Sequence, residues 1–171
     1  IVCIGERAFM YCSSLSSITL SNNIKTIEAE AFYNCSALSF INLPNTLKTI
    51  GESAFYNFPL NAISIPSSVT SIGAYAFENC DSLVNVIIPN NVVHVGHGLF
   101  ANCDLLQSVT LSNNIKALLT DYSISDYGFF QGCKSLIYVN LPDSLETIGA
   151  NAFFGCETLS SITILNSVTS I

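Results

Sequence analysis

Residues 60–80 read LNAISIPSSVTSIGAYAFENC and combine several features at fixed distances from one another. The alternating aliphatic residues Ile63 and Ile65 are followed directly by Pro66. Two more aliphatic residues, three positions apart, come next, and then a glycine, an alanine-phenylalanine pair and a cysteine. Alternation with a period of two predicts a short strand, and the proline ends it because proline has no amide hydrogen to donate to a ladder.

The same pattern recurs through the chain with a period of 23 residues. Seven phenylalanines mark it at spacings of 23, 23, 22, 23, 30 and 23 residues: Phe9, Phe32, Phe55, Phe77, Phe100, Phe130 and Phe153. The third unit lacks one residue between Phe58 and Leu60, and the sixth gains seven after Leu118. A single unit of this length cannot bury two apolar walls, so we expect the units to stack and cover one another.

Each unit also follows the aliphatic spacing of the leucine-rich-repeat template L-x-x-L-x-L-x-x-N, and residues 15–23 and 106–114 match it through to the asparagine. The central pair of this template predicts a short strand in every coil: Ile18/Leu20, Ile41/Leu43, Ile63/Ile65, Val86/Ile88, Val109/Leu111, Val139/Leu141 and Ile162/Ile164. The second aliphatic pair, such as Ile24 and Ile27, forms the other wall of the coil. The sequence therefore predicts a repeat solenoid of about seven 23-residue coils, mostly β, with short strands and tight turns or short helical turns.

The unit in residues 60–80 resembles the BspA-like (bacterial surface protein A type) leucine-rich repeat family. The match covers nearly the whole chain, and it is specific because proline, glycine, alanine-phenylalanine and cysteine all fall at set offsets. The resemblance implies a right-handed leucine-rich-repeat superhelix within a large cell-surface or secreted protein that adheres to matrix proteins or cells. It implies no shared catalytic residues. The chain departs from the family pattern at Phe58, which replaces the third cysteine, and in the long sixth unit.

We expect residues 1–171 to form a single leucine-rich-repeat solenoid with an insertion near residues 119–125. Ile1 and Ile171 occupy inner positions of neighbouring coils, and the polar units that cap natural solenoids are not seen at either end. These features favour a fragment of a longer repeat array.

Composition excludes several classes of partner. Half of the residues are apolar and 10% are charged, which is typical of a globular chain. No apolar run reaches the roughly 18 residues that cross a bilayer, and no signal peptide is seen, so no membrane span is expected. The net charge of −7 would repel phosphate backbones, so nucleic acid is not expected as a partner.

Six of the seven cysteines share one repeat position: Cys12, Cys35, Cys80, Cys103, Cys133 and Cys156. On adjacent coils their α-carbons would lie about 4.8 Å apart, within disulfide range, but parallel side chains need distortion to form a bridge. Phe58 occupies the same position in the third unit, which indicates an apolar environment. We interpret the six as buried free thiols that act as small hydrophobic residues, with disulfides or a metal site as the alternatives.

Other chemistry-bearing residues predict no site. His94 and His97 lie three residues apart without a third ligand at zinc-binding spacing, so we interpret them as surface or turn residues. Serines fall at the variable positions of each unit, and neither a nucleophile elbow nor a phosphate-binding glycine loop is present. We expect no enzymatic activity, no metal and no cofactor.

A solenoid presents the outward residues of its strands as one regular surface, which suits binding. The candidate binding residues on it are Ser17, Thr19, Phe40, Asn42, Asn85, Ile87, Ser108, Thr110, Tyr138 and Asn140. Phe40, Ile87 and Tyr138 are large enough to anchor a partner, although isolated apolar residues are also common on protein surfaces.

The insertion supplies a second candidate group, Asp121, Tyr122, Asp126 and Tyr127, because functional residues concentrate in loops that a scaffold does not require. Sequence drift explains the insertion equally well. Together these features favour a non-catalytic protein-interaction or adhesion module of a cell-surface or secreted protein, with a protein or glycan partner. An intracellular scaffold or structural spacer is the alternative, since free thiols suit a reducing compartment.

Overall fold

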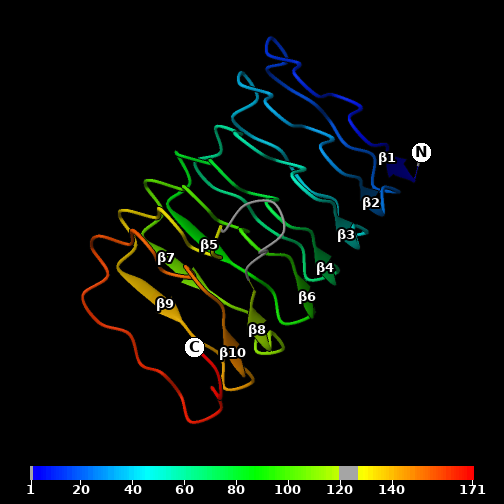
Figure 1. The fold of residues 1–171 in the computed structure, drawn as a ribbon. Coiled ribbons are helices and arrows are strands. Elements are labelled where there is room, and N and C mark those ends of the chain that lie inside the picture. Colours follow the sequence, from blue (N-terminus) through cyan, green and yellow to red (C-terminus); the bar gives the residue numbers. More distant parts are fainter. Residues whose placement is uncertain (1, 120–126) are drawn as a thin grey trace.

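The computed structural model of the chain describes residues 2–119 and 127–171. The chain winds into a stack of coils, with its N- and C-termini at opposite ends of the stack (Figure 1). Residues one repeat apart face each other in neighbouring coils, as in the pairs Thr26–Thr49 and Ile27–Ile50. The structure confirms the predicted repeat fold built from stacked parallel strands.

Ten strands of two or three residues are present in the described residues, and every strand pair is parallel. They are β1 (Cys3–Ile4), β2 (Thr26–Ile27), β3 (Thr49–Ile50), β4 (Ser71–Ile72), β5 (Asn85–Ile87), β6 (His94–Val95), β7 (Ser108–Thr110), β8 (Ala117–Leu118), β9 (Tyr138–Asn140) and β10 (Thr147–Ile148). The strand orders are β1-β2-β3-β4-β6 in one sheet, β8-β10 in a second, and β5-β7-β9 in a third on the opposite wall (Figure 1).

The prediction of a strand at the first aliphatic pair of every coil is wrong for four of the seven coils. Only β5, β7 and β9 form there, and the equivalent segments in residues 15–20, 38–43, 60–65 and 159–164 form no strand. The inward residue at the strand centre is valine in the three paired coils, as in Val109, and isoleucine in the other four, as in Ile41. The hydrogen-bonded segments therefore carry the smaller side chain.

The opposite wall, which the sequence pattern showed only as an apolar wall, carries the longer ladder. The second residue of the strands on this wall points into the core. Ile27 and Ile50 are examples, and neither has any exposed surface. A glycine follows in most coils because the backbones approach closely at this point. A Cβ on Gly96 would lie 2.1 Å from the nitrogen of Ala74 in the preceding coil. Such a contact is too short for any other residue.

The described residues contain no helix, because left-handed residues interrupt each turn that carries the phenylalanine. One such position is filled mostly by asparagine or glycine, the residues that adopt this conformation most readily: Asn34, Asn57, Asn79, Asn102, Gly132 and Gly155. The turns are joined between coils by hydrogen bonds such as that from Phe32 N–H to the Ala54 carbonyl, at 2.9 Å.

The core is a column of phenylalanine rings that runs along the stack. Successive rings of Phe9, Phe32, Phe55, Phe77, Phe100, Phe130 and Phe153 lie 5.2 to 5.9 Å apart between centroids, with interplanar angles of 3° to 20°. The rings from Phe32 to Phe130 are fully buried. The outer residues are thereby held at a regular spacing on both walls.

Candidate functional site

The candidate surface is built on the sheet β5-β7-β9, whose alternating residues point inward and outward. Val86, Val109 and Val139 occupy the central position of each strand and are buried. The residues on either side of them point away from the core. The pairing places Asn85 beside Ser108 and then Tyr138 in one row, and Ile87 beside Thr110 and then Asn140 in the other. We call these six residues the strand face.

The strand face combines two large exposed side chains with small polar ones. Ile87 is 68% exposed and Tyr138 is 55% exposed. They stand two strands apart, about 10 Å along the stack, on opposite rows. Between them, Ser108 donates a hydrogen bond to the Asn85 side-chain oxygen at 2.6 Å. The surface is thus an uncharged polar sheet with an apolar anchor near each edge.

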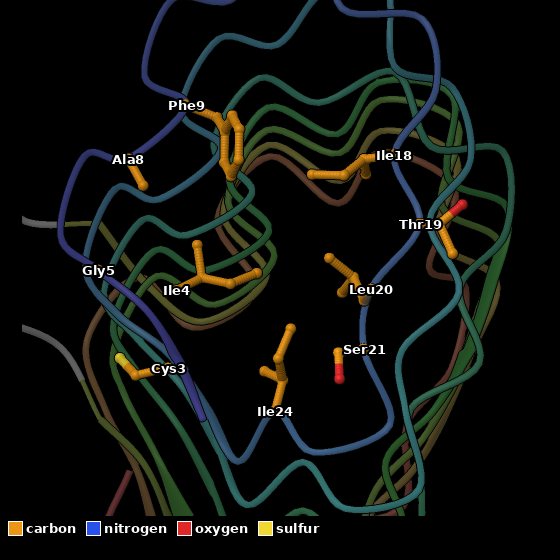
Figure 2. A pocket seen from close by; sticks show the side chains of 10 residues that line it. All are labelled: Cys3, Ile4, Gly5, Ala8, Phe9, Ile18, Thr19, Leu20, Ser21 and Ile24. Carbon is orange, nitrogen blue, oxygen red and sulfur yellow. The ribbon is translucent and has the colours of Figure 1, made fainter. Parts of the chain in front are cut away.

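The other predicted residues are not brought into this sheet. Ser17, Thr19, Phe40 and Asn42 are exposed, but they lie in coils whose segments form no ladder there. Phe40 is 68% exposed and lies two coils before Ile87. Figure 2 shows Thr19 pointing away from the interior while Ile18 and Leu20 point into it, as the alternation predicts.

Of the insertion residues, Asp121, Tyr122 and Asp126 lie outside the described residues. Tyr127 is half-buried, and its ring meets the ring of Tyr75 edge-on with the centroids 6.4 Å apart. Tyr75 belongs to the turn that precedes Phe77, so this contact is not on the strand face.

Sequence reasoning missed two exposed apolar residues in the coils that carry β7 and β9. Ile137, 58% exposed, directly precedes Tyr138, and its N–H donates to the Gln107 carbonyl at 2.9 Å. Leu105, also exposed, lies one coil earlier. Alignment of the repeats carries a signal for both, because most of the other coils have small or polar residues at these two positions.

Two shallow hollows flank the three-stranded sheet. One of about 390 Å³ lies between residues 63–65 and β5, with Ile87 and Pro89 on its far side. Another of about 280 Å³ lies between β9 and the last coil, with Tyr138 and Ile162 among its lining residues. The two anchors of the strand face therefore stand at the rims of two depressions.

A third hollow, of about 350 Å³, lies at the first coil and is the exposed end of the core. Figure 2 shows Ile4, Phe9, Ile18, Leu20 and Ile24 pointing into it. The same positions in the middle coils are covered by the coil before them. No polar side chains converge there as they would in a catalytic pocket.

The cysteines at the shared repeat position form a ladder of thiols whose middle members are buried. All seven cysteines are free, and each thiol from Cys35 onward donates to the carbonyl of the phenylalanine at the start of the preceding turn, as Cys103 does to Phe77 at 3.1 Å. Burial raises the pKa of Cys80 to about 12 and that of Cys156 to about 11. Cys35, Cys80, Cys103 and Cys133 are buried, as predicted, whereas Cys12 and Cys156 are only half-buried, so the prediction of six buried thiols is wrong for these two. Since the thiolate is the nucleophile, a raised pKa disfavours reaction of Cys80 and Cys156.

Glu78 is a buried carboxyl that the sequence analysis did not single out. It is only 6% exposed, and burial raises its pKa to about 7. It occupies the repeat position of Tyr33 and Tyr56, whose rings stack with centroids 4.3 Å apart. Burial, together with the Tyr56 hydroxyl, raises the pKa of Tyr33 to about 12. The only sequence signal is an acidic residue in a column of otherwise uncharged residues.

The histidines do not form a site in the described part of the chain. His94 is an exposed residue of β6, and the ring of His97 packs edge-on against Tyr75 at 4.7 Å between centroids. Within residues 2–119 and 127–171, no three His, Cys, Asp or Glu side chains gather as metal ligands would. The same residues include no helix that could span a bilayer.

The repeat of this chain matches a known family. The family model of the BspA type leucine rich repeat region, in six copies, matches residues 2–123 and 122–171. The chain belongs to this family. BspA-type repeats form protein-interaction modules, leucine-rich repeat families are generally non-enzymatic, and proteins with BspA-type repeats are typically found on bacterial surfaces.

Solved bacterial structures share the BspA-type fold of this chain. A leucine-rich repeat protein from Bacteroides ovatus ATCC 8483 is 33% identical with a TM-score of 0.89, over 98% of this chain and 42% of that one. The T. pallidum leucine rich repeat protein TpLRR is 34% identical with a TM-score of 0.85, over 94% of this chain and 72% of that one. The chain thus spans less than half of the B. ovatus protein. The comparison with curated proteins gives no match.

Proposed function

We propose that this chain is a non-catalytic module of a cell-surface or secreted BspA-type protein, and that it binds a protein or glycan partner through the strand face. The observation that carries the proposal is the exposure of Ile87 and Tyr138, two large side chains on a rigid, uncharged sheet. Large side chains that insert into pockets of a partner supply most of the free energy of binding at interfaces. Ile137 adds an exposed apolar side chain next to Tyr138, and the predicted residue Phe40 is exposed two coils before Ile87.

Family membership supports this proposal, since the related repeats serve interaction. The small polar residues of the sheet, Asn85, Ser108, Thr110 and Asn140, suit hydrogen bonds to a peptide or a sugar. The insertion candidates are a second possible contact; of these, Tyr127 lies beside Tyr75 at the turn side of the stack, and Asp121, Tyr122 and Asp126 lie outside the described residues.

The experiment compares the double variant Ile87→Thr/Tyr138→Ser with the wild type by surface plasmon resonance on immobilised extracellular-matrix proteins and on a glycan array. We expect the wild type to bind at least one probe and the double variant to bind it at least about tenfold more weakly. The matched control is Phe154→Ser, which removes a residue that is 66% exposed but lies in a turn, away from the strand face. Equal loss in the control, or no loss in the double variant, would contradict the proposal.

A second candidate is an intracellular scaffold or structural spacer, and the seven free cysteines favour it because disulfides are rare in reducing compartments. Surface proteolysis of intact cells that produce the parent protein separates the two candidates. Cleavage of the repeat by external protease supports surface display, and protection of the repeat until lysis supports the scaffold.

A further inference from the structure

The wall opposite the strand face carries a regular backbone ladder. At the step from β2 to β3, the N–H groups of Lys48 and Thr49 donate to the Lys25 carbonyl at 2.7 and 3.2 Å. The N–H of Gly51 donates to the Ile27 carbonyl at 2.7 Å. The same three bonds recur at the steps from β1 to β2, β3 to β4 and β4 to β6.

The ladder is broken once within the described residues, between β6 and β8. Repeat spacing would pair Ala117 with His94, and the amides of Lys116 and Ala117 would donate to the Val93 carbonyl. These bonds are absent in the described part of the chain, and β6 and β8 belong to different sheets. The pattern resumes on the far side of β8, where Glu146 and Thr147 donate to the Lys116 carbonyl at 2.7 and 3.1 Å. We call this interruption the breach.

The breach falls in the coil that is seven residues longer than the repeat, 30 against 23. The stack is intact on both sides of it. On one side, the Asn114 side-chain amide donates to the Asn90 carbonyl at 2.6 Å. On the other side, the rings of Phe100 and Phe130 stack at 5.9 Å. The opening is therefore local and does not separate two halves of the molecule.

Backbone groups of both strands face the breach. Ladder bonds to β10 use the carbonyls of Lys116 and Leu118, and in a parallel strand the intervening residue turns its groups the other way. The N–H and C=O of Ala117 therefore point toward β6, as do those of Thr49 toward β2 in the regular step. Extended backbone with unpaired donors and acceptors is a template for another strand.

A hollow of about 480 Å³ occupies the breach, within the volume range of sites that hold small ligands. It is lined by Val93, His94, Val95, Asn114, Ile115, Lys116, Ala117 and Leu119. Val93 and Leu119 are about half exposed, at 46% and 50%, so apolar side chains flank the unpaired backbone. The Lys116 ammonium is already paired with Glu146 at 3.2 Å, which leaves little charge to attract an ionic ligand.

We infer that the breach binds a short extended polypeptide segment by strand addition, with backbone hydrogen bonds to Ala117 and Val93 and an apolar side chain against Val93 and Leu119. Alternating amide and carbonyl groups at strand spacing are complementary to a peptide backbone, and the apolar rim selects the side chain. This site lies on the wall opposite the strand face. Its failure would therefore leave the proposed function untouched.

The test uses the peptide acetyl-Lys-Thr-Ile-Gly-Glu-amide, which copies residues 48–52, a segment that already forms this ladder in the chain. Its affinity is measured by calorimetry, and amide exchange is followed residue by residue by NMR. In the free protein, the Ala117 amide should exchange much faster than its equivalents Thr49 and Ser71. The peptide should slow the exchange of Ala117 at least about tenfold. A free protein in which Ala117 is as protected as Thr49 would overturn the inference.

Two controls address the backbone bonds directly. The same peptide N-methylated on its threonine and glycine keeps the side chains and loses two amide donors, so its affinity should fall at least about tenfold. Ala117→Pro removes the amide that faces the breach and should weaken binding similarly, whereas Ala117→Ser keeps the amide and should bind as the wild type. If circular dichroism shows that Ala117→Pro does not fold, the comparison of the methylated and unmethylated peptides still tests the backbone hydrogen bonds. Equal binding of the two peptides, or no binding of either, refutes strand addition.

Discussion

Replacing Phe77 with alanine tests the stacked core from which the strand face gets its spacing. The Phe77 ring is fully buried between Phe55 at 5.6 Å and Phe100 at 5.8 Å, with interplanar angles of 4° and 11°. Removal of a buried phenylalanine costs about 3 to 5 kcal/mol in transfer free energy and cavity formation. Phe77→Ala also removes two ring contacts, worth about 0.5 to 1.5 kcal/mol each, so its cost should lie toward the upper end of that range. For a domain of this size the melting temperature should fall by about 6 to 20 °C.

The matched control is Phe9→Ala at the end of the same column. Phe9 is only partly buried and stacks on a single ring, Phe32, at 5.2 Å. Removal of the Phe9 ring should cost less than half as much free energy of unfolding, because only one face of the ring is packed and a smaller cavity is left. Both variants are measured by calorimetry and by urea denaturation. A loss below about 1.5 kcal/mol for Phe77→Ala, or equal losses for the two variants, would refute the continuous stack.

Glu78→Gln should remove a pH dependence of stability. Because the pKa of Glu78 is about 7 in the folded chain and 4.5 in the unfolded one, the folded state binds more protons between these values, so the free energy of unfolding falls by up to about 3 kcal/mol as pH rises from 4.5 to 7. Urea denaturation from pH 4 to 8 should show this fall in the wild type and a flatter profile in the variant; parallel profiles would show that Glu78 is not the group responsible. Thiol labelling followed by mass spectrometry should modify the partly exposed Cys3 in the native protein while Cys103 reacts only after unfolding. Labelling of Cys103 in the native state would show that the ladder is open. Asn79, at φ 57°, should tolerate glycine, whereas alanine should destabilise by about 1 kcal/mol in thermal melts because its Cβ disfavours the left-handed region. Equal stability of the two variants would contradict the assigned backbone conformation.

Much of the fold follows from repeat positions alone. The phenylalanines fall at one repeat spacing and form one column, and Phe58, which replaces a cysteine, meets the Phe55 ring edge-on at 5.5 Å in the core. The strands were harder to predict. Aliphatic alternation indicates which side chains point inward, but a ladder also requires neighbouring backbones to approach within hydrogen-bonding distance. That distance depends on the packing beneath both segments, so the ladder at Ile41 is absent while the one at Val109 is present.

The candidate binding residues show the same division. Alternation identifies Ile87 and Tyr138 as outward-facing, and they are exposed. Only the structure shows that they lie on one hydrogen-bonded sheet and at the rims of two hollows. Ile137 was missed because its position lies outside the alternating pair.

The sequence by itself determined the repeat, its inward residues and the nature of the cysteine ladder, because a 23-residue period repeats each local choice and so makes it visible. Only the tertiary structure decided where neighbouring coils pair and where they do not. The breach between β6 and β8 shows why: Val93 and Ala117 follow the repeat like their counterparts, yet their hydrogen bonds are missing. Pairing depends on the distance between two backbones, which the sequence of either coil alone does not specify.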